Sequence, residues 1–480
     1  MEDGDKRKNY EKIVLSDCFE KMRDKNVSWL RQEHWMQIDH QYKQYFFECR
    51  LRSQELLSQF LVLIVLALGV VGVFSPYDYN ILPAVAILEL AVLLLSAFVF
   101  PPKGRVSVFL MMSVVAYLLI TFYVAVFLNN TNLLDYLQAY KAFIYVALLC
   151  SFIGKTFFSK VYVSKFFYIL VVLFLVKYLY SRVVGLDVWV SSRPGVYTEN
   201  NFELIFLLLL FYLVLPDLRW RTVFFLVVMA IVSLSGSRSA FLCLLVVYFF
   251  SVFRVGGFYW KKWLLLLPFL LFVGVFVVND RMDVSLGNSS TAAEVQPAIS
   301  PEASADIPGV TIEQDHEMTI RSFLEQGASV DRVRFLLLFL DNAEGWKWWN
   351  VLFGTEPLTP LSDETCRSLS YWSDLYSFSG DETCYSVILH SYIIRVIFDH
   401  GVMGLLFLIG FTAYGLRKSG YSWVDVLCVL GVLLASSLSV SAFNSVFAVL
   451  SMIFYFSRKE VPEDKNIGSG NSEFKSLGEN

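Results

Sequence analysis

The sequence predicts an all-α polytopic membrane protein with about twelve transmembrane helices and one large extracytoplasmic loop. Three observations predict this class. Apolar residues make up 56% of the 480-residue chain, and charged residues make up only 17%. Long apolar runs recur between Leu57 and Phe456, as expected for segments that cross about 30 Å of hydrocarbon. Basic residues alternate between these runs in the way that sets the orientation of membrane helices.

The apolar runs define the individual spans. Several runs are shorter than the roughly 20 residues that cross a membrane, so we expect those helices to extend into their flanking sequences. In chain order, the predicted spans are 57–74, 81–100, 106–127, 137–152, 162–180, 202–215, 222–234, 239–253, 264–278, 401–415, 424–438 and 441–456.

The orientation follows from one set of connections that is rich in Lys and Arg. This set alternates with connections that contain few basic residues, so we expect it to face the cytoplasm together with both termini. The basic connections contain residues 103–105, 155–160, 219–221, 254–262, 417–418 and 458–459.

This orientation divides the chain into five segments. The loop 280–389 holds eighteen acidic residues against six basic ones and should lie outside the cytoplasm. The segments are a cytoplasmic tail 1–56, transmembrane helices 1–9 at 57–279, the large loop 280–389, transmembrane helices 10–12 at 390–457, and a cytoplasmic tail 458–480.

Several motifs are absent from the sequence, and their absence disfavours some functions. The chain has no Gly-Lys-Ser phosphate loop, no His-Glu-x-x-His and no Cys-x-x-Cys. No acidic pair has metal-ligand spacing, and no basic stripe with interleaved aromatic residues lies outside the spans. We therefore expect no metal, no cofactor and no nucleic-acid partner, and neither an energy-coupled pump nor a zinc enzyme.

The cysteines divide by side of the membrane. Of the seven cysteines, only Cys366 and Cys384 fall in the predicted extracytoplasmic loop, which is the oxidising compartment. We therefore predict a structural disulfide between them.

Two groups of basic residues stand out on the predicted outer face. Arg238 lies in the turn Leu234–Ala240, where it could reach towards lipid headgroups or serve a function. Arg332 and Arg334 stand in a strongly acidic loop. They could pair with neighbouring carboxylates, or they could form an anion site, because guanidinium binds phosphate through two parallel hydrogen bonds.

A third polar feature lies where the large loop returns to the membrane. His390 occupies this position and is either an inert loop histidine or a catalytic one. Arg395 and Asp399 follow at a spacing of four, which favours an ion pair on the surface of a helix.

Two further features have alternative interpretations. Glu89 lies in the middle of the second predicted span, where a carboxylate either serves a function or ties helices together. The run Trp346–Trp349 could stack on sugar rings, although we slightly favour an aromatic belt at the bilayer surface.

The order of these features resembles the O-antigen ligase and polymerase family. Members share a Ser-Arg turn before a span, a large periplasmic loop with an Arg upstream of Leu-Phe-Gly, a following His, and a Gly-x-x-Gly helix start. The corresponding residues are Ser237-Arg238, then Arg334 or Arg332 with Leu352-Phe353-Gly354, then His390, then Gly401-Val402-Met403-Gly404. The chain departs from the family at Ser391, at Thr198–Asn201 and at Gly354–Glu356, where the family often has Asn, Asn-Pro-Asn and Gly-x-Gly.

The resemblance implies a metal-independent, inverting glycosyltransferase with a GT-C-like fold in the bacterial inner membrane. Its donor would be an undecaprenyl-diphosphate-linked glycan, and its acceptor either lipid A core or a second lipid-linked repeat unit. His390 would be the general base, and Arg238 with Arg334 or Arg332 would bind the diphosphate. Candidate substrate contacts are Arg193, Asn200, Asn201 and Trp348. The rival interpretation is a transporter or flippase of lipid-linked sugars.

Overall fold

The computed structural model describes most of the helical part of the chain. Apart from Leu56 and Leu57, the described residues fall in the larger of two units, Ser58–Asn480. They are residues 56–75, 83–98, 102, 104–183, 195–197, 200–235, 237–254, 331–369, 377–378, 383–389, 391–438 and 442–457.

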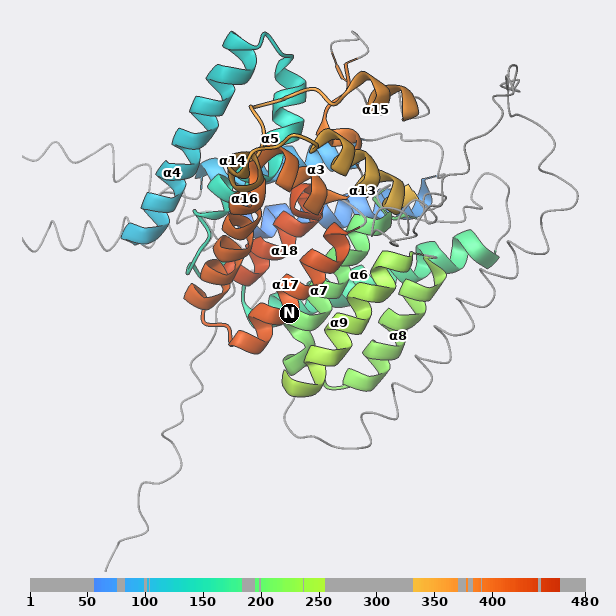
Figure 1. Cartoon of the computed structure of the whole chain (residues 1–480). Helices are drawn as coiled ribbons and strands as arrows, with labels where there is room; N and C mark the ends of the chain where they lie inside the picture. Colours follow the sequence, from blue (N-terminus) through green and yellow to red (C-terminus); the bar gives the residue numbers. More distant parts are fainter. Residues whose placement is uncertain are drawn as a thin grey trace, which may run out of the picture. The chain divides into compact units, whose positions relative to one another are not determined.

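The regular structure of the described residues is helical (Figure 1). A first helix, Leu56–Phe74, precedes the labelled ones. The others are α3 (Ala84–Phe98), α4 (Arg105–Phe122) with the π-helix η1 (Tyr123–Leu128), α5 (Leu133–Leu149), α6 (Lys160–Val183), α7 (Asn200–Val214), η2 (Leu215–Asp217), α8 (Arg221–Leu234), α9 (Arg238–Arg254), α13 (Asp331–Asn342), α14 (Trp348–Phe353), α15 (Asp363–Ser368), η4 (Ser386–Ile388), α16 (Tyr392–Lys418), α17 (Trp423–Ser437), η5 (Ala442–Asn444) and α18 (Val446–Phe456).

Each predicted span coincides with a helix, except 264–278, which lies outside the described residues. Within the described part, four helices are long and apolar enough to cross a membrane: Leu56–Phe74, Arg105–Leu128, Lys160–Tyr180 and Tyr392–Lys418. The helix around the predicted span 401–415 begins earlier than expected, at Tyr392, because it continues through a kink at Gly401.

Helix α7 forms the centre of the bundle. Its residues from Leu204 to Val214 are all nearly inaccessible to solvent. A helix that is apolar on every side is buried within protein or lipid, and here neighbouring helices α6, α9, α17 and α18 pack against it. Helices α9 and α17 also pack along each other, so the two halves of the chain share one core (Figure 1).

At one end of the bundle, several basic connections meet. The N–H groups of Phe157 and Phe158 donate to the Ser457 carbonyl at 2.8 and 3.1 Å. Ser419 donates through its hydroxyl to the Phe456 carbonyl at 3.1 Å. Arg254 pairs with Asp425 at 2.9 Å, which joins the end of α9 to the start of α17.

At the other end, connections that are poor in basic residues meet. Asn444 and Arg395 both donate to the Gln138 carbonyl, at 3.2 and 2.6 Å. The Lys177 ammonium donates to the Ser75 carbonyl at 2.6 Å, which joins the end of α6 to the end of the first helix. These contacts join residues near those ends of the helices that the distribution of Lys and Arg predicts to face outwards.

Glu89 ties two helices together. Its carboxylate on α3 accepts hydrogen bonds from Lys141 and Tyr145, which both lie on α5. This contact agrees with the interpretation of Glu89 as a link between helices, because its charge is balanced by a neighbouring ammonium group.

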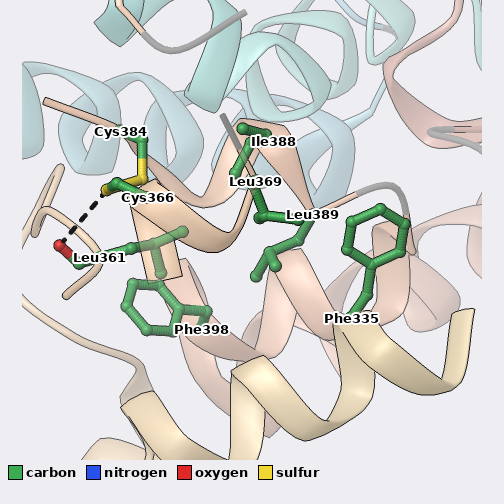
Figure 2. Packing of buried hydrophobic residues seen from close by; sticks show 8 residues of the cluster. All are labelled: Phe335, Leu361, Cys366, Leu369, Cys384, Ile388, Leu389 and Phe398. Atoms are coloured by element: carbon green, nitrogen blue, oxygen red, sulfur yellow. Dashed lines mark hydrogen bonds between the residues drawn. A yellow bond between two sulfur atoms is a disulfide. The ribbon is translucent and has the colours of Figure 1, made fainter. Parts of the chain in front are cut away.

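The described part of the large loop forms a small module around the expected disulfide. Cys366 and Cys384 are bonded, with their Cα atoms 5.7 Å apart. Figure 2 shows Leu369 and Leu389 lying between this disulfide and Phe335 of α13. Phe398 of α16 belongs to the same buried cluster, so the module is packed onto the start of that helix.

Candidate functional site

The site forms around a kink in α16, where two sequence motifs come together. Gly401 interrupts the helix with φ 66° and ψ −176°. The segment Leu352–Gly354 packs against the kink so closely that a Cβ atom on Gly401 would lie 2.2 Å from the Leu352 carbonyl oxygen. A Cβ atom on Gly354, at φ 84°, would lie 2.5 Å from the His400 nitrogen. Glycine is required at both positions, because they combine positive φ with close backbone approach.

Two hydrogen bonds fix the same contact from the loop side. Thr355 donates to the Phe398 carbonyl through its backbone N–H at 2.8 Å and through its hydroxyl at 3.1 Å. The Leu-Phe-Gly segment of the loop and the Gly-x-x-Gly start of the span are therefore one structural unit, although nearly fifty residues separate them in the sequence.

Arg395 and Asp399 lie inside this unit, and their prediction as a surface pair is wrong. Their residues are only 3% and 6% exposed. Arg395 Nη2 donates to the Gln138 carbonyl at 2.6 Å, while Nε lies 3.9 Å from Asp399 Oδ2. The Ser386 hydroxyl donates to Asp399 at 2.6 Å. The start of α5 and the turn η4 cover this face of α16, which the spacing of the two charges could not reveal.

His400 is a buried polar residue that the sequence analysis did not select. Its Nδ1 lies 2.8 Å from the Tyr117 hydroxyl of α4. The rings of Tyr140 and Phe143 pack on it at centroid distances of 4.9 and 4.4 Å. The sequence did contain a signal for selecting His400. It directly precedes Gly401 of the Gly-x-x-Gly motif, and it is one of only five histidines in the chain.

Arg334 lies in the disulfide module. It is half-buried on α13 and donates through Nη2 to the Ser368 carbonyl. The neighbouring Phe335 anchors α13 in the buried cluster that contains the disulfide and Phe398 (Figure 2). Trp348 lies on α14 with 68% of its surface exposed, as an aromatic belt or a sugar contact would require.

Arg238 is the first residue of α9 and is exposed. Ser237 precedes it, and the Ser237 hydroxyl accepts a hydrogen bond from the Ala240 N–H at 3.2 Å, as helix-capping serines do. A cation at a helix N-terminus is unfavourable for the helix dipole. Helix stability therefore does not explain an arginine at this position.

Some predicted site residues cannot be placed. His390 and Arg193 lie outside the described residues, as do the side chains of Arg332, Asn200 and Asn201. The two neighbours of His390, Leu389 and Ser391, are both buried. The structure gives the local setting of Arg238 and of Arg334, and their convergence with His390 stays a prediction.

A polar cavity of about 390 Å³ opens beside the unit that Leu352–Gly354 forms with the kink at Gly401. One wall is the connection Asn129–Thr131 between α4 and α5. The other walls are Glu356 with Leu358–Pro360, and Thr383 with Tyr385. Within the described residues, no group of three or more His, Cys, Asp or Glu side chains is placed to hold a metal ion.

Comparison of the chain with protein-family models, with curated proteins and with solved structures finds no match.

Proposed function

We propose that this chain is a glycosyltransferase that moves an undecaprenyl-diphosphate-linked glycan to an acceptor hydroxyl at the periplasmic face of a bacterial inner membrane. The observation that carries the proposal is the packing of Leu352–Gly354 against Asp399–Gly401. These segments contain two of the motifs that resemble the O-antigen ligase and polymerase family. Their contact supports a shared site, because it places the two motifs in one structural unit.

The proposed chemistry assigns a role to each polar motif. His390 takes the proton from the acceptor hydroxyl as that oxygen attacks the anomeric carbon. The bond from this carbon to the diphosphate breaks on the opposite face, so the sugar is inverted. Arg238 and Arg334, or Arg332 in place of Arg334, stabilise the charge that develops on the departing diphosphate. This step requires no metal ion.

The proposed topology has twelve spans, with both termini in the cytoplasm and the loop 280–389 in the periplasm. The Lys and Arg distribution supports this arrangement. The contacts of Ser457 also support it, because they join the start of one basic connection, at Phe157 and Phe158, to the end of α18, which precedes another.

The alternative function is a transporter or flippase of the same lipid-linked sugars. A flippase needs polar or charged residues along a path through the bilayer. Among the described spans, Glu89 and Lys141 form an ion pair with each other, and the Lys177 ammonium donates to the carbonyls of Gly72 and Ser75. These partners favour the transferase, because the charges serve contacts between helices.

A reconstituted assay tests the proposal and separates its two forms. The purified full-length protein in liposomes is given lipid-linked repeat units, with or without lipid A core. Longer lipid-linked glycans identify a polymerase, and glycan on lipid A core identifies a ligase. Movement of the lipid-linked sugar between leaflets without a new glycosidic bond would contradict the proposal and favour the transporter.

A further inference from the structure

The polar cavity beside the kink is built from segments that are distant in sequence. Asn129 donates through its side-chain amide to the Pro357 carbonyl at 3.3 Å, and these residues are 228 positions apart. This bond joins the connection between α4 and α5 to the loop segment that follows α14. The fold therefore holds the cavity walls in fixed positions relative to each other, as expected of a binding site that is formed before its ligand binds.

The Asn129–Thr131 wall and the Glu356–Pro360 wall each contain a non-glycine residue with positive φ. Asn130 has φ 52° and Leu358 has φ 56°, and they are the two non-glycine residues with positive φ in the described part of the chain. Asparagine tolerates this region, but leucine does so at a cost. Strained residues persist where the surrounding structure holds them, and they cluster at functional sites. Both of these residues line the same cavity.

Two of the wall residues belong to a buried cluster rich in aromatic rings. Leu358 and Tyr385 are buried in one cluster with Tyr136 and Tyr140. The rings of Tyr136 and Tyr140 stack at 4.5 Å, and Tyr140 packs in turn on His400. The cavity wall is thus connected through packed rings to the kink in α16.

The chemistry of the lining selects a class of ligand. The described lining contains the amides of Asn129 and Asn130, the carboxylate of Glu356 and the hydroxyls of Thr131 and Thr359. Asn129, Thr131 and Thr359 each donate one hydrogen bond to a backbone carbonyl, so the two hydroxyls face a ligand as acceptors. None of the described residues that line the cavity is basic. Such a lining does not favour a phosphate, which binds best to guanidinium or ammonium groups. It matches a neutral ligand with several hydroxyl groups, because amides donate to and accept from hydroxyls, while a carboxylate and hydroxyl oxygens accept from them.

We infer that this cavity binds a neutral sugar ring of the transferred glycan. The inference rests on the proposed function for the identity of the ligand. The cavity would hold the carbohydrate, whereas the arginines would hold the diphosphate, so the two parts of the donor or acceptor have separate sites. Tyr385 places the cavity wall close in sequence to His390, which follows through the turn η4.

Two substitutions each remove a protein side-chain group that would contact the sugar, and they change the shape of the cavity walls little. Glu356→Gln removes the carboxylate charge at an exposed position. Asn130→Gly removes the amide but retains a residue that adopts φ 52° without strain. Glu344→Gln is the matched control, since it makes the same chemical change at an exposed position of the loop that does not line the cavity.

The test measures sugar binding without catalysis. Full-length protein in lipid nanodiscs is titrated with methyl glycosides of glucose, galactose, N-acetylglucosamine and rhamnose, and binding is read by saturation-transfer NMR. We expect at least one glycoside to bind. Glu356→Gln and Asn130→Gly should weaken that binding about tenfold, the loss typical of one hydrogen bond to a charged or buried group, while Glu344→Gln leaves it unchanged.

Three results would overturn the inference: no glycoside binds, the two cavity variants bind as well as the control, or inorganic phosphate competes with the sugar. The proposed function is tested separately by transfer of lipid-linked glycan. A protein that binds glycosides in this cavity but forms no new glycosidic bond would refute the transferase and leave the sugar site intact. Transfer that is insensitive to both cavity variants, without glycoside binding, would refute the sugar site alone.

Discussion

Arg395 and Asp399 form a buried pair whose role is to position the start of α16. Arg395 reaches the Gln138 carbonyl of α5, and Asp399 accepts from Ser386 in η4. The pair therefore connects the span to a neighbouring helix and to the loop module. Burying two charges is costly, and a buried pair is stable only when each partner neutralises the other.

A double-mutant cycle tests this coupling. Asp399→Asn and Arg395→Met should each destabilise the protein by about 3–5 kcal/mol, because each leaves one buried charge without its partner. The double variant should lose much less than the sum of the two single losses. Thermal unfolding of detergent-purified protein measures the loss of stability in the two single variants and in the double variant. Additive losses would show that the two side chains act independently.

At the scale of elements, the kink at Gly401 joins the loop module to the membrane helix. Gly401→Ala and Gly354→Ala should each sharply reduce the amount of folded protein and its melting temperature. Each substitution combines the cost of positive φ, about 1 kcal/mol, with a Cβ atom placed within 2.5 Å of a backbone atom.

Gly410→Ala is the control within the same helix, because nothing lies within 4 Å of its added Cβ atom. It should be neutral or slightly stabilising, since alanine favours a helix by about 1 kcal/mol over glycine. The same yield of folded protein by size exclusion and the same melting temperature for all three variants would refute the close packing of Leu352–Gly354 on α16.

The disulfide stabilises the loop module as an element. Cys366 and Cys384 are separated by 18 residues, and a loop of that length gives about 3 kcal/mol on a chain-entropy estimate. Replacing both cysteines with serine should lower the melting temperature accordingly. Alkylation of denatured, unreduced protein should modify the buried free Cys150 and leave Cys366 and Cys384 unmodified. Alkylation of both loop cysteines would contradict the bond.

The proposed topology of the chain requires the two sets of connections to face opposite sides of the membrane. Reporter fusions at Ser300 and Arg238 should report the periplasm, and fusions at Lys155 and Gly420 should report the cytoplasm. The last two positions are the control, because Gly154 and Ser419 are hydrogen-bonded to each other and must share a side. A cytoplasmic signal at Arg238 would remove that residue from the proposed site.

The helices were largely predictable because apolar runs such as Leu204–Val214 are continuous in the sequence. The Cys366–Cys384 bond was predictable because the topology left only these two cysteines outside. The burial of Arg395 and Asp399 was not predictable, because a spacing of four residues occurs on exposed and on covered helix faces alike. The cavity was also beyond prediction, because Asn129 and Pro357 meet only through tertiary packing.

In the proposed mechanism, a histidine and two arginines at the outer face catalyse the transfer of a lipid-linked glycan. The most direct measurement is the transfer rate of reconstituted protein with lipid-linked repeat units, for the wild type and for His390→Ala, Arg238→Ala, Arg334→Ala and Arg332→Ala. Loss of the base should reduce the rate by about 10²–10⁴, and loss of an arginine by about 10²–10³, with equal protein in the membrane.

Arg334→Ala and Arg332→Ala serve as controls for each other. The variant that loses activity identifies the arginine that binds the diphosphate together with Arg238. A transferase that depends on His390, Arg238 and one of these two arginines is the predicted result. Wild-type transfer by His390→Ala would contradict the general-base mechanism, and the absence of any transfer by the wild-type protein would contradict the function itself.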